Sequence, residues 1–116
     1  MMERTSVIQW NIRGILNKKK ELIQLMNDHK ASIVAVQETL MPDNYMYKIP
    51  NFNLISRHGT LNRRNHGGVA LYIHQDVPYI EIALNTQLQA VAATVQLRSK
   101  LTICSFYNSC NHTFQY

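Results

Sequence analysis

The chain has 116 residues, of which 46% are hydrophobic, and its formal net charge is +5. This length can bury a core, and it fits one domain or part of a larger one. No run approaches the roughly 18 apolar residues that cross a bilayer, and the chain opens on a strand-like run rather than a signal segment. We therefore expect no membrane partner and an intracellular location, nuclear or cytoplasmic. The positive charge favours a polyanionic partner.

A strand, a helix and a second strand are predicted at the start of the chain. Residues 5–10 form a short run rich in residues that favour β-strands, and this run ends at Asn11. The helix has Asn17 as its candidate N-cap, and its apolar stripe recurs at helical spacing. The stripe consists of Leu22, Ile23, Leu25, Met26 and His29. Residues 32–37 form a near-continuous apolar run, which is typical of a strand covered on both faces.

This order of elements is a βαβ unit, whose two strands run parallel and are joined by a right-handed crossover. Asn11 follows the first strand and Glu38 ends the second. Both residues are therefore expected at one edge of the sheet. In open α/β sheets the carboxyl edge of the strands is where ligands bind, so the topology alone predicts a site there.

The rest of the chain is predicted to be mostly β. A loop covers residues 42–50, and strands are expected at 52–56, at 69–73 and, more weakly, at 79–83. Residues 88–97 and 101–106 are expected to pair as a hairpin across the polar turn at 98–100. That last strand ends at Tyr107. Tyr107 thus follows an apolar strand, as Asn11 and Glu38 do.

Two basic clusters are expected between elements of regular structure. Residues 18–20 are three lysines, for which a solvated helix start is slightly favoured over contact with nucleic acid. The second cluster runs from Arg57 through Arg63 and Arg64 to His66. For this loop the preference is reversed, and nucleic-acid binding is the favoured interpretation.

Several reactive or conspicuous residues are expected to serve structure rather than chemistry. Cys104 and Cys110 lack metal-ligand spacing, and free, packed thiols are favoured over a disulfide. Gly67 and Gly68 are expected to serve backbone geometry. His29 lies on the apolar stripe of the predicted helix and is not expected to be catalytic.

Four short motifs follow one another along the chain: QWNIRG at 9–14, VQET at 36–39, GGVA at 67–70 and SFY at 105–107. In this order and spacing they resemble the N-terminal motifs of the endonuclease/exonuclease/phosphatase superfamily. More narrowly, they resemble the apurinic-endonuclease-like domain of non-LTR retrotransposons of the jockey type. The resemblance runs from about Val7 to Tyr107. It implies an α/β (α+β) fold, the N-terminal half of a four-layered α/β/β/α sandwich, with residues 1–116 forming one partial domain whose C-terminal half is absent.

The resemblance also implies an activity, hydrolysis of DNA phosphodiesters with Mg²⁺ or Mn²⁺ as cofactor. Glu38 matches the metal-binding glutamate of the family, and Asn11 matches its active-site asparagine, which supports the metal or the phosphate. Tyr107 matches a tyrosine that reaches the scissile phosphate, although the proline-containing segment usual after it is replaced here by Asn-Ser-Cys. In the parent element a reverse transcriptase would follow downstream. Arg57, Arg63, Arg64 and His66 are the expected DNA contacts.

The chain lacks two further motifs of the family, one like Gly-Asp-Phe-Asn and one like Ser-Asp-His. Because positioning and acid–base groups act multiplicatively, the isolated chain is expected to be nearly inert, and whether it is an enzyme stays open. Apolar surface or unpaired edges are expected along 69–73 and 88–106, with poor solubility or association. The alternatives are a repair-like or small-substrate phosphoesterase of the same superfamily, a non-catalytic nucleic-acid-binding remnant, or a relic without a role.

Overall fold

The computed structural model describes residues 6–42, 45–58, 67–86 and 88–107. One α-helix and seven strands make up these residues, with a short 3-10 helix before the α-helix. Their bounds are β1 (Ser6–Asn11), η1 (Ile15–Asn17), α1 (Lys19–Asp28), β2 (Ala31–Gln37), β3 (Phe52–Arg57), β4 (Val69–His74), β5 (Tyr79–Ile82), β6 (Gln89–Gln96) and β7 (Lys100–Tyr107). Each predicted strand is present, with ends that agree or differ by one residue.

The strands form two sheets. The first has the order β1-β2-β4-β3, and the second has the order β5-β6-β7. β1 and β2 are parallel, with Asn11 opposite Gln37, while the other neighbours are antiparallel. The predicted βαβ unit and the predicted hairpin are both confirmed.

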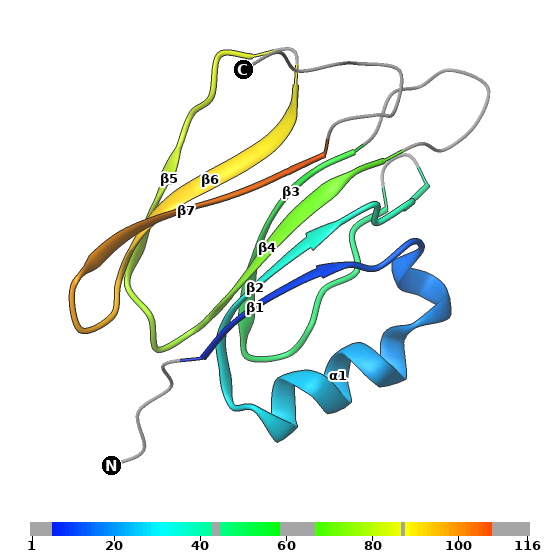
Figure 1. The fold of residues 1–116 in the computed structure, drawn as a ribbon, viewed down its shortest axis with the longest axis horizontal. Helices are drawn as coiled ribbons and strands as arrows, with labels where there is room; N and C mark the ends of the chain where they lie inside the picture. The colour runs from blue at the N-terminus through cyan, green and yellow to red at the C-terminus, as the bar shows by residue number, and fades with distance from the viewer. Residues whose placement is uncertain (1–5, 43–44, 59–66, 87, 108–116) are drawn as a thin grey trace, which may run out of the picture.

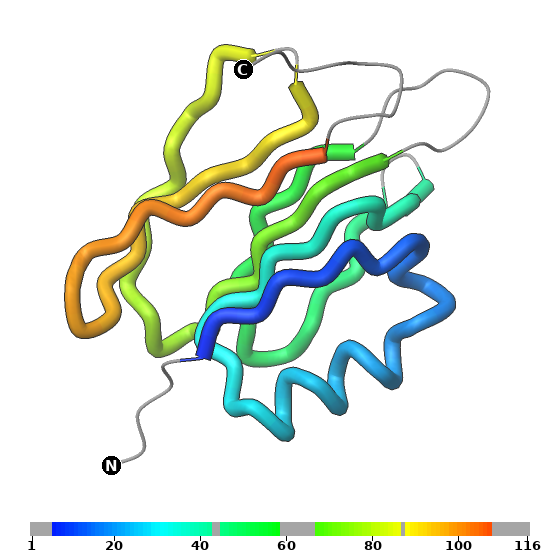
Figure 2. Tube along the Cα trace, viewed as in Figure 1, coloured from blue at the N-terminus to red at the C-terminus, as the bar shows by residue number. Residues whose placement is uncertain are grey.

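The molecule is layered, as Figures 1 and 2 show. Helix α1 covers one face of the four-stranded sheet, and the three-stranded sheet lies across the other face. β7 packs against β2 and β4, and β6 packs against β4 and β3. The arrangement is an α/β sandwich in which three of the four expected layers are seen, so the predicted fold class is confirmed. None of the described helices is long and apolar enough to cross a membrane.

Strands β2 and β4 form the centre of the core. All residues of both strands are buried, and alternate side chains join two different clusters. Val34, Val36 and Tyr72 belong to the cluster on the helix side, while Ile33 and Leu71 belong to the cluster between the sheets. This double burial explains the continuous apolar run that the sequence shows at 32–37.

The expectation of exposed apolar surface was therefore wrong for residues 69–73. It holds for residues 88–106, where Phe106 is 50% exposed and Leu101 is 42% exposed. β7 is an edge strand with no partner strand on its outer side among the described residues. Cys104 in β7 is free, but it is exposed rather than packed as predicted, because it alternates with the inward-facing Ser105.

The start and end of the helix also differ from the prediction. Asn17 is not the N-cap, because residues 15–17 form a 3-10 turn and Lys18 precedes the first α-helical residue without a side-chain capping bond. At the other end His29 is the C-cap and is exposed, so it does not extend the apolar stripe. The buried residues of the stripe are Leu22 and Met26.

Tyr72 makes the stability of the fold depend on pH in the alkaline range. Its ring is fully buried, and its hydroxyl donates a 2.6 Å hydrogen bond to the carbonyl of Tyr47. Burial, and to a lesser extent the neighbouring phenols of Tyr47 and Tyr45, raise the pKa of Tyr72 above its ordinary value. As pH rises, the phenol of Tyr72 therefore loses its proton in the unfolded chain before it does so in the folded protein. The contribution of Tyr72 to the free energy of unfolding is full below about pH 10, and it is lost as pH rises toward the folded-state pKa.

Replacing Tyr72 with phenylalanine is expected to lower the free energy of unfolding by about 1 kcal/mol at neutral pH, since one hydrogen bond is lost. Above about pH 10 the wild type should lose stability with a slope approaching 1.4 kcal/mol per pH unit from this residue. The difference between the two proteins should therefore shrink and then reverse. Urea unfolding at pH 7 to 11 measures it, and a pH-independent difference would contradict the assignment.

Candidate active site

The carboxyl ends of β1 and β2 continue side by side beyond the last strand residues. The amides of Ile12, Gly14 and Ile15 donate to the carbonyls of residues 37, 38 and 39, at 3.0, 2.9 and 3.0 Å. These bonds hold the segment after Asn11 against the segment that contains Glu38. Asn11 and Glu38 therefore lie at the same edge of the sheet, as the topology predicts.

The backbone at this edge is strained. Arg13, Glu38 and Leu40 have φ values of 51°, 53° and 52°, a left-handed conformation that residues with a Cβ seldom adopt. Each such residue costs about 1–3 kcal/mol, and it persists only where the surroundings fix it. Because three of them gather around two strand ends, the strain is concentrated at the edge where a ligand would bind.

Gly67 and Gly68 connect this edge to the second sheet. Their carbonyls accept hydrogen bonds from Leu40 and Thr39, at 2.9 and 3.2 Å, and the amide of Gly68 donates to the Gln89 side chain at 2.6 Å. Both glycines have positive φ, 72° and 90°. The predicted role of the double glycine in backbone geometry is confirmed.

Tyr107 packs directly on this glycine pair. A Cβ added to Gly67 would lie 2.7 and 2.9 Å from two carbons of the Tyr107 ring. Gln89, which contacts both glycines, is the ladder partner of Tyr107 in the second sheet. The double glycine thus lies between the end of β7 and the loop that follows Glu38, and it contacts both.

A cavity of about 350 Å³ lies where β1 and β7 approach each other, and Asn11 and Tyr107 both line it. Its other lining residues are Gln9, Gln37, Cys104 and Phe106. Neutral amides and aromatic rings therefore surround this space, and the Asn11 side chain faces it from an exposed strand position. The structure brings Asn11, Glu38 and Tyr107 to one end of the sandwich.

A chain of polar side chains joins the two sheets beside this cavity. Gln9 donates to Gln37, Gln37 donates to the Ser105 hydroxyl at 2.9 Å, and Ser105 donates to the Val36 carbonyl at 3.0 Å. Gln37 is 8% exposed and Ser105 1% exposed. The sequence interpretation missed both residues. The available signal was a polar residue at an inward position of each strand.

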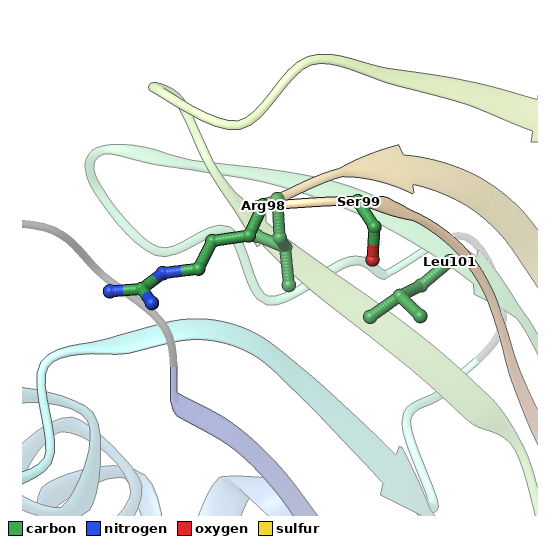
Figure 3. A pocket seen from close by; sticks show the side chains of 4 residues that line it. Arg98, Ser99 and Leu101 are labelled. Atoms are coloured by element: carbon green, nitrogen blue, oxygen red, sulfur yellow. The ribbon is translucent and has the colours of Figure 1, made fainter.

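A second cavity, of about 420 Å³, lies at the opposite end of β7 and has no share in this site. It is lined by Leu97, Arg98, Ser99 and Leu101 around the turn of the hairpin. In Figure 3 the Arg98 side chain points away from Ser99 and Leu101. Of the described residues, two leucines and no carboxylate line this space, so they offer little for catalysis.

The basic residues are placed differently from the prediction. Arg57 is the last residue of β3 rather than a loop residue, and it donates to the carbonyls of Thr86 and Leu88 at 3.2 and 2.9 Å. Those bonds compete with any contact to phosphate. Arg63, Arg64 and His66 lie outside the described residues.

The lysines at 18–20 do not form a uniformly solvated helix start either. Lys18 donates to the carbonyls of Ile12 and Arg13, and Lys19 lies over the ring of Tyr47, 5.0 Å from its centre. Lys20 is exposed, within α1. The charge of Lys18 is thereby fixed beneath the strained segment of the site.

The donors at this edge suit a hard cation in kind, although they are few. Mg²⁺ prefers oxygen ligands and is often held by one or two carboxylates together with substrate phosphate. Glu38 supplies one carboxylate with a 22% exposed side chain, and Asn11 supplies an amide oxygen. Among residues 6–42, 45–58, 67–86 and 88–107, no three His, Cys, Asp or Glu side chains gather. The residues therefore fit a weak cation site that substrate oxygens would complete.

Comparisons with known proteins agree with this architecture. The sequence model of the endonuclease/exonuclease/phosphatase family matches residues 8–106, which include Asn11, Glu38 and the double glycine. A comparison with curated proteins returned no match. Since the family match spans most of the chain, this protein belongs to the endonuclease/exonuclease/phosphatase family.

Proposed function

We propose that this chain carries part of the active site of a divalent-metal-dependent phosphodiesterase that acts on DNA. The observation that carries the proposal is that Asn11 and Tyr107 line one cavity, and that Glu38 lies at the same sheet edge as Asn11. A carboxylate, an amide and a phenol at a shared edge are groups that phosphoryl transfer uses. The family as a whole generally depends on divalent metals.

Each residue has a distinct proposed role. Glu38 would hold Mg²⁺ or Mn²⁺, and a cation bound there supplies charge neutralisation on the phosphoryl oxygens. Asn11 would orient a phosphoryl oxygen with its neutral amide. Tyr107 would donate its hydroxyl hydrogen bond to the phosphate as charge develops, an interaction that typically contributes a few kcal/mol.

The proposed substrate is DNA, and the proposed origin is a retrotransposon of the jockey type. The net charge of +5 supports an anionic polymer, and the four motifs resemble those of this branch of the family. Arg57 adds little support because its guanidinium is bonded to two carbonyls. Arg63, Arg64 and His66 remain the proposed DNA contacts.

We further infer that catalysis needs a partner segment, the other half of such a domain. On the face of β1 that is turned away from the helix, Val7, Gln9 and Asn11 are exposed. On its other face, Ile8 and Trp10 pack toward the helix. The outer edge of β7 has no strand beside it within the described part of the chain. A strand paired with β7 would cover the inner face of β1 and add groups beside Asn11.

The test is a Mg²⁺-dependent plasmid-nicking assay on this polypeptide. Little nicking is expected, because only three of the groups that act together are present and each absent one typically costs 100-fold or more. Robust nicking that Glu38→Ala abolishes would overturn the expected inactivity. Salt-sensitive DNA binding that is unchanged by Glu38→Ala, with no cation bound at Glu38, would favour a non-catalytic binding remnant instead.

A further inference from the structure

Arg13 occupies a distinctive position beside the carboxylate of Glu38. Its side chain is 80% exposed, and its Nε atom lies 3.7 Å from Oε2 of Glu38. That separation exceeds the 2.7–2.9 Å typical of a charge-assisted hydrogen bond. Within the described part of the chain the guanidinium makes no hydrogen bond. The contact is therefore a loose ion pair, and most of the five N–H donors of Arg13 stay available.

The main chain of Arg13 is fixed by contacts that do not involve its guanidinium. Gly14, the next residue, donates to the carbonyl of Glu38, and the carbonyls of Ile12 and Arg13 accept from Lys18. These bonds hold the left-handed backbone of Arg13 in place. The side chain is thus anchored at its base and can reorient at its tip. The ammonium of Lys18 adds positive potential beneath it.

We propose that Arg13 is a phosphate-binding residue, held on Glu38 in the metal-free protein and released to substrate when Glu38 takes a divalent cation. The proposal rests on the function proposed above for Glu38. Glu38 cannot serve a cation and a guanidinium equally well, so the two compete for one carboxylate. A released guanidinium beside Asn11 has the planar fork that binds phosphate oxygens in pairs.

The competition predicts effects of opposite sign. Replacing Arg13 with glutamine should tighten Mn²⁺ binding roughly threefold, because a rival cation is removed. The same change should weaken binding of inorganic phosphate to the Mn²⁺-loaded protein about tenfold, because charge-assisted hydrogen bonds are lost. A residue with a merely structural role would move both affinities in the same direction.

A metal-free measurement tests the ion pair by itself. In Glu38→Gln the guanidinium loses its carboxylate partner, so inorganic phosphate should bind more tightly than to the wild type. That gain should disappear in the double variant R13Q/E38Q. Lys20→Gln is the matched control, since it removes the same charge from an exposed position on α1.

The experiment is an NMR titration of each metal-free variant with inorganic phosphate. Isothermal calorimetry measures Mn²⁺ binding, and it also measures phosphate binding to the Mn²⁺-loaded proteins. Melting temperatures within about 2 °C of the wild type would show that the exposed substitutions leave the fold intact. The proposal is overturned if R13Q behaves like K20Q, if both affinities fall together, or if E38Q gains phosphate affinity equally with and without Arg13. Unchanged Mn²⁺ binding in E38Q would instead contradict the proposed metal role of Glu38. The phosphate titration of the metal-free proteins would still test the ion pair between Arg13 and Glu38.

Discussion

Replacing Gly67 with alanine is expected to lower the free energy of unfolding by about 2–4 kcal/mol, the sum of a left-handed backbone penalty and overpacking. The φ of Gly67 is 72°, and an added Cβ would lie 2.7 Å from the Tyr107 ring and clash with the Gln89 side-chain oxygen. Neither neighbour can retreat easily. Gln89 is bonded to Gly68, and Tyr107 ends a strand paired along its full length with β6.

Gly14→Ala is the matched control for this prediction. Gly14 also has a positive φ, 106°, but a Cβ there would meet its nearest neighbours, on Asn17 and Leu40, at 3.7 and 3.8 Å. Its backbone, with φ 106° and ψ 96°, lies beyond the left-handed helical region, so Gly14→Ala should incur a backbone penalty of about 1–3 kcal/mol without overpacking. Urea unfolding followed by the fluorescence of Trp10 measures both. A loss in Gly67→Ala no larger than the left-handed backbone penalty, about 1–2 kcal/mol, would show that the contact with Tyr107 adds nothing.

The consequence of Gly67→Ala should reach the site itself. Gly67 accepts the hydrogen bond from Leu40, two residues beyond Glu38, and its other side contacts Tyr107. A shift at Gly67 therefore moves the loop after Glu38 relative to Tyr107. In this way the double glycine sets the spacing between two proposed catalytic residues without contacting substrate.

The local part of the fold could be predicted from the sequence. The apolar run at 32–37 reflects a strand that is buried on both faces. The helical spacing of Leu22 and Met26 reflects a helix that is buried along one stripe. Short connections then require parallel strands, and parallel strands place Asn11 and Glu38 at one edge. Each of these steps uses residues close in sequence, where spacing determines geometry.

The contacts between distant segments could not be predicted in the same way. Arg57 resembles a DNA-binding residue in sequence, but the end of β3 lies near the carbonyls of residues 86 and 88, which accept the hydrogen bonds of its Nη1 atom. Lys18 resembles a solvated charge in the sequence, but in the structure its ammonium donates to the carbonyls of residues 12 and 13. The left-handed conformation of Glu38 also has no local signal, and the Glu38 carbonyl is held by Gly14, in the segment that follows β1.

The chain of polar side chains that joins the two sheets, called here the polar bridge, is the basis of the second large expected loss of stability. Ser105→Ala is expected to cost about 1–3 kcal/mol, because it leaves the buried Gln37 amide without its Ser105 acceptor and removes the hydroxyl that donates to the Val36 carbonyl. Thr102→Ala, on the exposed face of the same strand, should change stability by no more than about 0.5 kcal/mol. That contrast separates the bridge from a general effect on β7.

Adding Gln37→Leu to Ser105→Ala should restore part of the loss, since removing both partners leaves no unsatisfied side-chain amide in the interface. Gln9, which also bonds Gln37, is exposed and can turn to water. The double-mutant cycle should therefore give a coupling of about 1–2 kcal/mol between residues that are 68 positions apart in sequence. Urea unfolding of the four proteins measures it. Strict additivity would mean that apolar packing alone aligns β7 on β2, and that Tyr107 is brought to Asn11 without help from the polar bridge.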